Sequence, residues 1–335
     1  MNTPSWFLKK NIISWLLWPF SILYICGHLA VYIFRLFHQK TSKRPVICIG
    51  GILAGGVGKT PVVYEIARRF GAVIVMRGYK GIKDRGKTES KLVKTSDSAN
   101  NVGDEAKMLA NHGLRVYVGP DRWESIKLAE NQGSHTPGPH PIVFDDGFQN
   151  PSVKKDVSIL VFDGKIGVGN GFCLPAGPLR EPLYMGLNRA DAVIIIKNDD
   201  DSQFAIHNSQ IPVFLAKNEL VNPGLHGKVV AFAGIGYPRK FFDSVAKMPN
   251  VSIVKSIPFP DHYDYKKQDI ADLFKCAEKH GAQLCCTEKD WVKLPEIFRN
   301  KIKYVPLRTT IQPEFWEWLD SRIAQIGEKS AVNNK

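Results

Sequence analysis

The sequence predicts an α/β protein with a mainly parallel sheet in a larger core, a second, smaller α/β lobe, and a membrane-associated helix at the N-terminus. Three observations predict this arrangement. A long run without charged side chains stands near the N-terminus, short apolar runs alternate with helix-like stretches after it, and a glycine-rich loop joins one such run to a helix. At 335 residues the chain has the length of about two domains.

Composition restricts the class of protein further. With 44% hydrophobic and 23% charged residues the chain is globular, which excludes disorder, collagen and coiled coil. Lysine and arginine outnumber aspartate and glutamate by 45 to 32, and this net charge of +13 favours nucleic acid, an anionic lipid or a phosphorylated substrate as partner. The six cysteines form no CxxC pair and have no interleaved histidines, which disfavours a disulfide scaffold or a structural zinc site.

The uncharged run near the N-terminus covers residues 11–34. As a helix it would extend about 36 Å, at about 1.5 Å per residue, against about 30 Å of bilayer hydrocarbon. The run is too long for a signal-peptide core and lacks a small-residue cleavage site, so we expect it to be retained. Basic residues are more frequent after it than before it, which places the rest of the chain on the cytoplasmic side.

The same run carries a narrow polar stripe. Its members are Ser14, Ser21 and His28 within the run and Arg35 directly after it, spaced seven residues apart. Pro19 can kink the helix or allow it to lie in the membrane interface. A buried core helix is the competing interpretation. We expect membrane attachment, with spanning the bilayer and lying in its interface both open.

From residue 45 onward, strand-length apolar runs alternate with helix-like stretches. Predicted strands of the first lobe are Val46–Ile49, Ala72–Met76, Arg115–Val118, Pro141–Phe144, Val157–Phe162 and Ala192–Ile196. Those of the second are Lys228–Ala233, Val251–Ile257 and Gln283–Thr287, with helices over Arg239–Ala246 and Lys267–His280. The turn-rich segment Leu220–Gly227 separates the two sets. We therefore predict an N-terminal segment 1–44, a core 45–222 and a smaller lobe 223–335.

The strongest local signal is the sequence GGVGKT at residues 55–60, between the strand VICIG and the helical run PVVYEIARRF. A strand, a glycine-rich loop and a helix in this order make a P-loop, in which backbone N–H groups and the helix N-terminus hold phosphate. Lys59 would contact the β- and γ-phosphates, and Thr60 would offer its hydroxyl to Mg²⁺. The larger core is therefore predicted to be of the P-loop NTPase type.

The residues predicted to bind the nucleotide are Leu53, Ala54, Gly55, Gly56, Val57, Gly58, Lys59 and Thr60. The usual pattern GxxxxGK[ST] has glycine where this chain has Leu53, so the match is to the GGxGKT part. A plain glycine turn at a helix start is the competing interpretation.

A carboxylate motif follows at residues 141–150, PIVFDDGFQN, where an apolar strand ends in two aspartates. A buried strand can hold a carboxylate beside the phosphate loop, and Mg²⁺ prefers oxygen ligands. Asp145, Asp146 and Gln149 therefore join Thr60 as candidate metal-site residues, with Gln149 orienting a ligand or a water. Without a P-loop before it, such a strand end would more often be an ordinary turn.

Ten short stretches carry a resemblance that covers nearly the whole chain. They are GGVGKTP (55–61), RGYKG (77–81), VGDEAKMLA (102–110), VYVGPDR (116–122), FDDGFQN (144–150), LPAGPLREP (174–182), RADAVI (189–194), FAGIGYPRKFF (232–242), FPDHYDY (259–265) and TEKDWVKL (287–294). In this order they resemble the tetraacyldisaccharide 4′-kinase family, the lipid A 4′-kinases of Gram-negative bacteria.

The resemblance implies a P-loop core and a smaller lobe with ATP and substrate between them. It implies transfer of the γ-phosphate of ATP to the 4′-hydroxyl of a tetraacylated disaccharide 1-phosphate, which makes lipid IVA at the cytoplasmic face of the inner membrane. The basic surface and the membrane segment suit this anionic lipid. We expect ATP and Mg²⁺ as cofactors, no nucleic-acid partner and a monomer.

The resemblance also implies roles for individual residues. Asp104 matches the catalytic aspartate that accepts the proton of the sugar hydroxyl, and His262 matches the histidine that pairs with it. Lys59 completes the implied catalytic set. Because Asp104 and His262 fall on different predicted lobes, closure of the lobes would assemble the base around bound substrate. A helix cap and a surface loop are the structural alternatives for these two residues.

Four further residues in matched stretches are candidates to contact substrate or phosphate: Glu105, Arg77, Arg122 and Arg180. The chain also departs from the family pattern at Gly51, where asparagine is usual, at Leu53 and Val57, where small hydroxyl residues are frequent, and at Asn150, where histidine is usual. These departures affect only the contacts of those side chains.

Three other classes of protein fit less well. A P-loop GTPase needs an NKxD-type guanine reader, and the nearest stretches, KNDD (197–200) and TEKD (287–290), have the wrong order. A dinucleotide-binding oxidoreductase is suggested by GIG at residues 234–236, but Arg239 stands where its third glycine belongs. A nucleic-acid binder would also be basic, but no RRM-type or zinc-finger motif is present.

Overall fold

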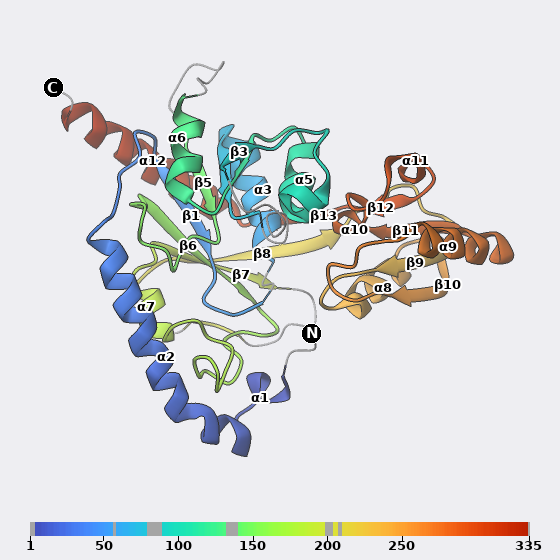
Figure 1. Cartoon of the computed structure of the whole chain (residues 1–335), viewed down its shortest axis with the longest axis horizontal. Helices are drawn as coiled ribbons and strands as arrows, with labels where there is room; N and C mark the ends of the chain where they lie inside the picture. Colours follow the sequence, from blue (N-terminus) through green and yellow to red (C-terminus); the bar gives the residue numbers. More distant parts are fainter. Residues whose placement is uncertain are drawn as a thin grey trace.

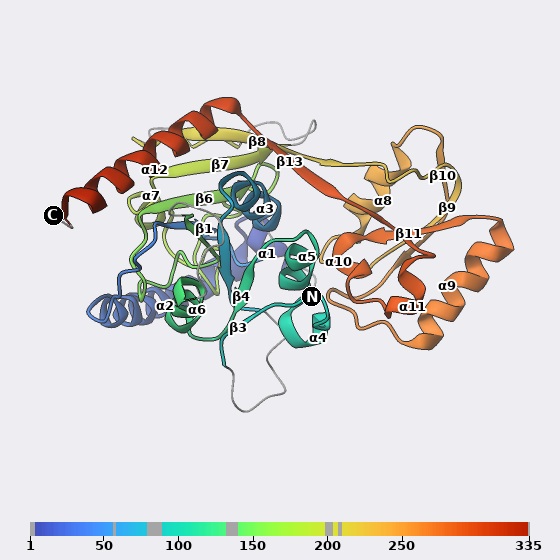
Figure 2. The same cartoon turned by 90° about the horizontal axis from the view of Figure 1, so that it is seen from above.

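The computed structural model of the chain consists of two lobes that lie side by side (Figures 1 and 2). It describes residues 4–55, 58–78, 89–131, 140–197, 204–206 and 210–333. Gly56 and Val57 of the predicted phosphate loop therefore lie outside the described residues. The predicted α/β fold, with a mainly parallel sheet in the larger lobe, is confirmed.

Within the described residues, the larger lobe is built on a nine-stranded sheet of order β13-β8-β7-β6-β1-β5-β2-β4-β3. The strands from β8 to β4 are parallel, while β13 and β3 run antiparallel at the two edges. The strands are β1 (Val46–Gly50), β2 (Val73–Met76), β3 (Lys91–Leu92), β4 (Val116–Val118), β5 (Ile142–Asp145), β6 (Val157–Asp163), β7 (Ala192–Lys197), β8 (Val213–Leu220) and β13 (Leu307–Ile311).

Helices cover both faces of this sheet. One face packs against α3 (Lys59–Phe70), α5 (Asp104–Asn111) and α12 (Pro313–Asn333), which share an apolar core with alternate residues of the strands. The other face packs against α6 (Arg122–Asn131) and α7 (Leu183–Leu187). The short α4 (Ala99–Val102) leads into α5. Since both faces are covered, the strands are almost continuously apolar, as parallel strands in a sheet covered on both faces generally are.

The smaller lobe has a four-stranded parallel sheet of order β10-β9-β11-β12. Its strands are β9 (Gly227–Ala233), β10 (Val251–Pro258), β11 (Gln283–Thr287) and β12 (Lys303–Val305). Its helices are α8 (Pro238–Ala246), α9 (Lys267–His280), α10 (Glu288–Trp291) and α11 (Glu296–Arg299). Phe241 and Val245 of α8 pack on one face, and Ile270 and Leu273 of α9 pack on the other.

Two strands of the larger sheet lead to and from the smaller lobe. The chain leaves at the end of β8 and returns along β13, which pairs antiparallel with β8 from Leu307 opposite Leu220 to Ile311 opposite Ala216 (Figure 2). The helix α12 then packs on the larger sheet, where Phe315 and Leu319 are fully buried. The predicted boundary near residue 222 falls between β8 and β9, but residues 307–333 of the predicted smaller lobe belong to the larger one. Apolar side chains of α12, among them Phe315 and Leu319, complete the core of the larger lobe.

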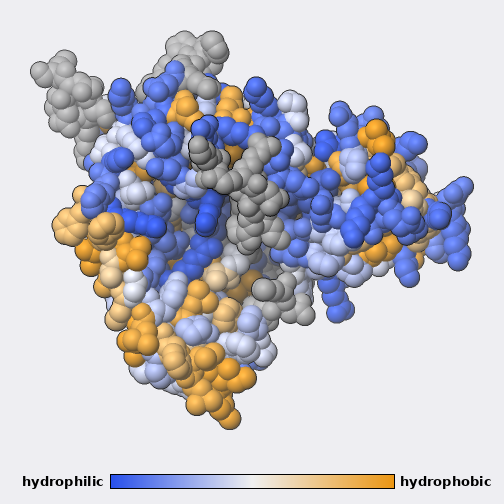
Figure 3. Space-filling view, viewed as in Figure 1, coloured by the Kyte–Doolittle hydropathy of each residue, from blue (hydrophilic) through white to orange (hydrophobic). Residues whose placement is uncertain are grey.

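The N-terminal segment forms α1 (Ser5–Leu8) and the long α2 (Ile12–Leu36). The helix α2 lies along the edge of the larger lobe, where Ser14 and Ser21 are buried and Tyr24 and Ile25 pack on the core (Figure 1). It is the one described helix long and apolar enough to cross a membrane, and only 6% of its apolar window is buried. Figure 3 shows hydrophobic side chains gathered along the side of the molecule where α2 runs.

Each strand predicted from the sequence is present, with ends that shift by at most one residue. Four strands were not predicted: β3, β8, β12 and β13. β8 alternates buried and exposed residues, and β13 is largely exposed. These strands at or near the sheet edge therefore lack the continuous apolar run that marked the central strands.

Candidate functional site

The predicted site residues lie at the carboxyl ends of the central parallel strands. β1 stands in the middle of the larger sheet, with β5 on one side and β6 on the other. The chain continues from β1 to one half of the sheet and later fills the other half, so β1 marks the switch in strand order. Ligands of open parallel sheets bind at the carboxyl edge next to such a switch. The phosphate loop follows β1 at this point.

The ends of the phosphate loop have the backbone that a P-loop needs. Gly58 has φ +78° and directly precedes α3, so glycine is required there and the helix begins at Lys59. Leu53, at the unusual position, is buried, pairs with Leu179 and packs in the core under α7. Its neighbour Ala54 donates its N–H to the Pro178 carbonyl at 2.7 Å. The leucine thus anchors the start of the loop to the segment before Arg180.

Lys59 and Arg180 converge on one carboxylate. The Lys59 Nζ lies 2.9 Å from Asp146 Oδ1, and Arg180 Nη1 donates to both oxygens of Asp146, at 3.0 and 3.1 Å. Burial alone would raise the pKa of Asp146, but these two cations outweigh it and lower that pKa. Asp146 has φ +51°, a left-handed backbone that turns its side chain toward the loop. The structure therefore brings three of the predicted residues together.

Asp145 is the last residue of β5 and is buried. Its Oδ1 has no hydrogen-bond partner among the described residues. Burial and then the charge of Glu105 raise the pKa of Asp145 to about 7, against the lowering influence of Lys59. A buried oxygen without a donor is the kind of atom that a cation satisfies.

The chemistry of these donors fits Mg²⁺. Asp145 and the Thr60 hydroxyl supply oxygen, and Mg²⁺ commonly takes only one or two protein ligands beside waters and substrate phosphates. Within the described residues no group of three or more histidine, cysteine, aspartate or glutamate side chains could hold a metal ion by itself. The site thus suits a cation that arrives with phosphate.

Gln149 is engaged within the protein. Its Nε2 donates to the Gly51 carbonyl and to Glu181 Oε1, both at 2.9 Å, while its Oε1 faces Arg180 at 3.5 Å. Glu181 is buried and pairs with Arg189. Gln149 therefore ties the start of the phosphate loop to the Arg180–Glu181 segment, and its contacts hold Arg180 near Asp146.

Arg122 and Arg77 stand at neighbouring strand ends. Arg122 opens α6, is buried, and donates from Nη1 to the Gly119 carbonyl at 2.8 Å. Burial, followed by the charge of Arg77, lowers the pKa of Arg122 to about 10, while Asp145 and Asp146 act in the opposite direction. Its Nε has no partner among the described residues. Arg77 directly follows β2 and is exposed.

Asp104 and His262 meet across the lobes. Asp104 is the first residue of α5 in the larger lobe, and His262 follows β10 in the smaller lobe. His262 Nδ1 lies 2.8 Å from Asp104 Oδ2, so a ring protonated at Nδ1 donates to the carboxylate. The side chains are 10% and 17% exposed, enough burial to hold the pair in one geometry. The predicted dyad is thus in contact in this structure.

The next residue, Glu105, links the phosphate loop to the smaller lobe. It accepts a hydrogen bond from Thr60 Oγ1 at 3.0 Å and lies 3.1 Å from the Nζ of Lys289 on α10. Burial would raise the pKa of Glu105, but Lys289 first, and then Thr60 and Lys59, lower it. Two further contacts between the lobes, Asn100 with Asp264 and His112 with Glu288, flank this one.

His262 is held by a buried network behind it. Its backbone has φ +57°, and its N–H donates to the Gly234 carbonyl at 3.0 Å. The Gly234 N–H in turn donates to Asp290 Oδ2 at 3.0 Å. Asp290 is fully buried, accepts from Thr287 Oγ1 at 2.6 Å and pairs with Lys293 at 2.7 Å. This network fixes the backbone from which the imidazole extends.

Sequence reasoning did not select Lys289, Asp290 or Glu181 as site residues. A signal for the first two was available: both follow a buried strand, β11, at its carboxyl end, in TEKDWVKL (287–294), one of the ten stretches that carry the family resemblance. Glu181 also lies in a matched stretch, LPAGPLREP (174–182), but its partner Gln149 is 32 residues earlier, and their contact required the structure.

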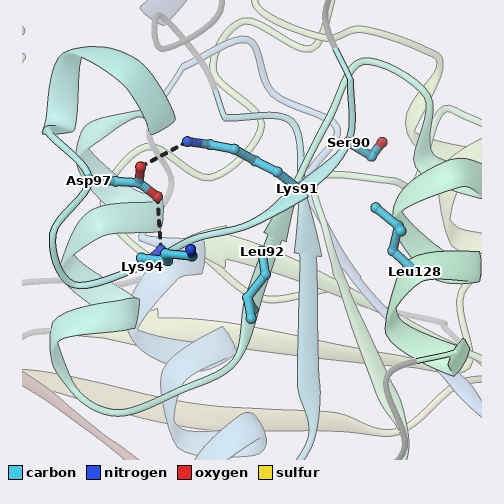
Figure 4. Close-up of a pocket in the computed structure, with 6 residues that line it drawn as sticks. All are labelled: Ser90, Lys91, Leu92, Lys94, Asp97 and Leu128. Atoms are coloured by element: carbon cyan, nitrogen blue, oxygen red, sulfur yellow. Dashed lines mark hydrogen bonds and ion pairs between the residues drawn. The ribbon is translucent and has the colours of Figure 1, made fainter.

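A separate cavity of about 480 Å³ lies at the β3 edge of the larger sheet (Figure 4). It is lined by Ser90, Lys91, Leu92, Lys94, Asp97 and Leu128. Lys91 pairs with Asp97 at 2.9 Å on one side of it. None of the predicted site residues lines this cavity, so it is distinct from the phosphate-loop site.

Comparison with known proteins agrees with this geometry. A curated tetraacyldisaccharide 4′-kinase of Phenylobacterium zucineum is 42% identical over 94% of this chain and 96% of its own length. Another of that name, from Gluconobacter oxydans, is 37% identical over 90% of this chain and 91% of its own. A crystal structure of LpxK from Aquifex aeolicus in complex with ATP has a TM-score of 0.76 and 27% identity, over 94% of this chain and 99% of that one.

The family model for tetraacyldisaccharide-1-P 4′-kinase matches residues 13–324, which is nearly the whole chain. The match includes the phosphate loop, both members of the Asp104–His262 pair and both lobes. The resemblance read from ten short stretches is therefore confirmed, and the chain belongs to the tetraacyldisaccharide-1-P 4′-kinase family.

Proposed function

We propose that the protein is an ATP-dependent lipid kinase that transfers the γ-phosphate of ATP to the 4′-hydroxyl of tetraacyldisaccharide 1-phosphate, forming lipid IVA. Membership of the family and relatives of this name support the reaction. The observation that carries it in the structure is the contact of Asp104 with His262 beside the phosphate loop. A phosphate site and a base on a neighbouring element are the two parts that phosphoryl transfer to an alcohol requires.

The phosphate loop is the proposed ATP site. The described residues at its boundary are Leu53, Ala54, Gly55, Gly58, Lys59 and Thr60. The similar Aquifex aeolicus structure contains ATP. Lys59 would contact the β- and γ-phosphates on leaving Asp146. Mg²⁺, where bound, would be held by Thr60 and Asp145 and would neutralise charge on the phosphates.

Asp104 is the proposed general base. As the new O–P bond forms and the bond to the leaving ADP oxygen breaks, the proton of the 4′-hydroxyl passes to the Asp104 carboxylate. His262 orients this carboxylate through the 2.8 Å hydrogen bond. It also stabilises the negative charge of Asp104 until the carboxylate accepts the proton. Arg180, Arg122 and Arg77 surround the phosphate site and are proposed to neutralise phosphate oxygens.

We further propose that α2 attaches the protein to the cytoplasmic face of the inner membrane while lying in the plane of the surface. The first part of the polar stripe faces the protein: Ser14 and Ser21 are buried, and Ser21 Oγ donates to the Cys173 carbonyl at 2.8 Å. Nearer the other end of the helix, Tyr32 lies under the Arg189 guanidinium at 4.7 Å. Contacts from Ser14 to Tyr32 cover about 27 Å of helix at 1.5 Å per residue, so this length is not free to be surrounded by lipid.

The opposite side of α2 is apolar and exposed. Its exposed hydrophobic residues include Ile12, Ile13, Trp15, Leu16, Trp18, Phe20, Ile22, Leu23, Leu29, Val31, Ile33, Phe34 and Leu36. Aromatic residues and basic flanks are typical of a helix at the membrane interface. In this position α2 would place the phosphate-loop site beside a substrate whose acyl chains remain in the membrane. The monomer expected from the sequence remains part of this proposal.

The proposed reaction is tested with γ-labelled ATP, Mg²⁺ and tetraacyldisaccharide 1-phosphate in detergent. Asp104→Asn and His262→Ala are each expected to lower kcat, by about 10²- to 10⁴-fold for loss of a general base, with little change in ATP binding. Wild-type protein should produce labelled lipid. Labelled lipid at the wild-type rate from Asp104→Asn would remove this residue from the proposed role, and no product from wild type would refute the reaction itself.

A further inference from the structure

Lys289 is the one described lysine of the smaller lobe with a contact to the site on the larger lobe. It is the second residue of α10, directly after the carboxyl end of β11. Its Nζ lies 3.1 Å from Glu105 Oε1, and the other oxygen of Glu105 accepts from Thr60 Oγ1 at 3.0 Å. A single carboxylate therefore separates the Lys289 ammonium from the hydroxyl of the phosphate loop.

The surroundings of Lys289 keep it charged. Burial would lower its pKa, but Glu105 first, with Asp104 and Asp261 beyond it, outweighs burial and raises that pKa. Lys289 is 23% exposed, so it is partly desolvated and its field acts on groups nearby. The ammonium thus stands near both the proposed base and the proposed phosphate position.

Phosphoryl transfer is served by cations placed around the moving group. Negative charge spreads over its three equatorial oxygens and the leaving oxygen, and fixed cations stabilise that charge. Lys59 approaches from the phosphate loop of the larger lobe. Lys289 approaches from the opposite lobe, on the side that also supplies His262.

We propose that Lys289 is a further catalytic residue of the kinase, whose ammonium contacts the transferring phosphoryl group from the smaller lobe. On this inference, which rests on the proposed function, Glu105 holds the lysine in reach of the phosphate and shares it with an equatorial oxygen. The bond to O4′ forms as the bond to ADP breaks, the proton goes to Asp104, and Lys289 keeps its own protons throughout.

The chain offers a matched control at the neighbouring position. Glu288, on the same short helix, makes the adjacent contact between the lobes, 2.5 Å from His112 Nε2 on α5. Glu288→Gln weakens a lobe contact without touching the phosphate site. If Lys289 served only to hold the two lobes together, Lys289→Gln and Glu288→Gln would lower kcat by similar factors.

The experiment compares wild type, Lys289→Gln, Lys289→Arg and Glu288→Gln in labelled phosphate transfer from Mg-ATP to tetraacyldisaccharide 1-phosphate. Lys289→Gln is expected to lower kcat by about 10²- to 10³-fold, as for loss of one transition-state donor, with a small change in the KM for ATP. Lys289→Arg should recover a large part of the lost kcat because it keeps the positive charge. Glu288→Gln should stay near wild type.

Several outcomes overturn the inference: equal losses in Lys289→Gln and Glu288→Gln, a loss confined to KM, or wild-type kcat in Lys289→Gln. If Lys289→Gln does not fold, as judged by thermal unfolding, Lys289→Met removes the charge in its place and is compared with Glu288→Gln. A kcat about 10²-fold below that of Glu288→Gln supports a role at the phosphate, and equal values overturn the inference. Wild-type protein that transfers no phosphate to the lipid refutes the proposed function instead.

Discussion

At the scale of single residues, the carboxylates of this site differ because their neighbours differ. Asp146 is held between Lys59 and Arg180, whereas Asp145, one residue before it, is buried with an oxygen that no described group satisfies. The same strand end therefore presents one paired and one unpaired carboxylate. Adjacent aspartates look equivalent in sequence, and only the positions of the cations distinguish them.

The raised pKa of Asp145 predicts a pH dependence. Its folded value of about 7 lies above the ordinary aspartate value of 3.8, so the folded protein is favoured while this carboxyl is protonated, and this contribution is lost as pH rises toward 7. Asp145→Asn is therefore expected to raise the Tm at pH 8 in the absence of Mg²⁺ while weakening Mg-ATP binding. Calorimetric unfolding and titration with Mg-ATP measure the two effects.

Mg-ATP binding to wild type should weaken as pH falls below about 7, because protons compete for Asp145. In Asp145→Asn this pH dependence should be reduced. A Tm that falls in the variant at pH 8, or an unchanged pH dependence of binding, contradicts the assignment of the cation site.

Asp290 and Lys293 form a buried pair, 0% and 2% exposed, whose disruption has a predictable cost. Asp290→Asn leaves a buried ammonium without its partner, which destabilises proteins by about 3–5 kcal/mol. It also weakens the support of Gly234, from which His262 is held. Urea unfolding should show the loss of stability, and kcat should fall with it.

Because an apolar replacement of both members can be close to neutral, Asp290→Asn with Lys293→Met should recover much of the stability but not the kcat.

At the scale of elements, the sequence predicted those whose signals are local. The phosphate loop was predicted because strand, glycines and helix are adjacent in the chain, and the central strands because continuous apolar runs mark burial on both faces. The contact of Asp104 with His262 followed only from a family resemblance, since 158 residues separate them. The pairing of Lys289 with Glu105 had no signal of that kind and required the structure.

The orientation of α2 also required the structure. Its seven-residue polar stripe was visible in sequence, but whether that stripe faced protein, lipid or water was not. Ser21 Oγ donates to the Cys173 carbonyl and accepts from the Ala176 N–H, so the stripe faces the protein at this residue. The narrow stripe is therefore the docking side of the helix, and the wide apolar side is left outward.

This orientation predicts which substitutions detach the protein from membranes. Leu16 and Leu23 are 68% and 69% exposed on the outer side of α2, so Leu16→Glu with Leu23→Glu should release the protein from vesicles of anionic phospholipid in flotation assays. The kcat on detergent-dispersed lipid should change little. Ile297→Glu, at a 74% exposed residue of the smaller lobe, is the matched control and should remain bound. Retention of the double variant contradicts attachment through this side.

At the scale of the whole molecule, the lobes are connected twice, because β13 returns to pair with β8. The sequence predicted two lobes and the boundary after β8, but not this return. β13 is short and largely exposed, and α12 carries its apolar residues in a pattern that fits either lobe. The core that the apolar residues of α12 complete is decided by contacts with residues far away in the sequence. Phe315, for example, packs with Phe214, about a hundred residues earlier in the chain.

Phe315 should therefore matter for the larger lobe rather than the smaller one. Its ring is fully buried and contacts Phe214 and Trp318, at centroid distances of 5.4 and 6.0 Å. Phe315→Ala is expected to destabilise the larger lobe by about 3–5 kcal/mol through lost burial and a cavity. Hydrogen exchange should show reduced protection in strands such as β7 and β8. Loss of protection confined to β9–β12 would contradict this placement.

The return of β13 and α12 has a consequence for how the chain is made. The strands of the smaller sheet are all present once residue 305 has been synthesised, whereas the larger lobe, whose first strand begins at residue 46, has no complete core until Phe315 and Leu319 emerge. Synthesis runs from one end and domains fold as units. The lobe that starts first on the ribosome is thus the one whose core is completed last, and this is the lobe that carries the phosphate loop.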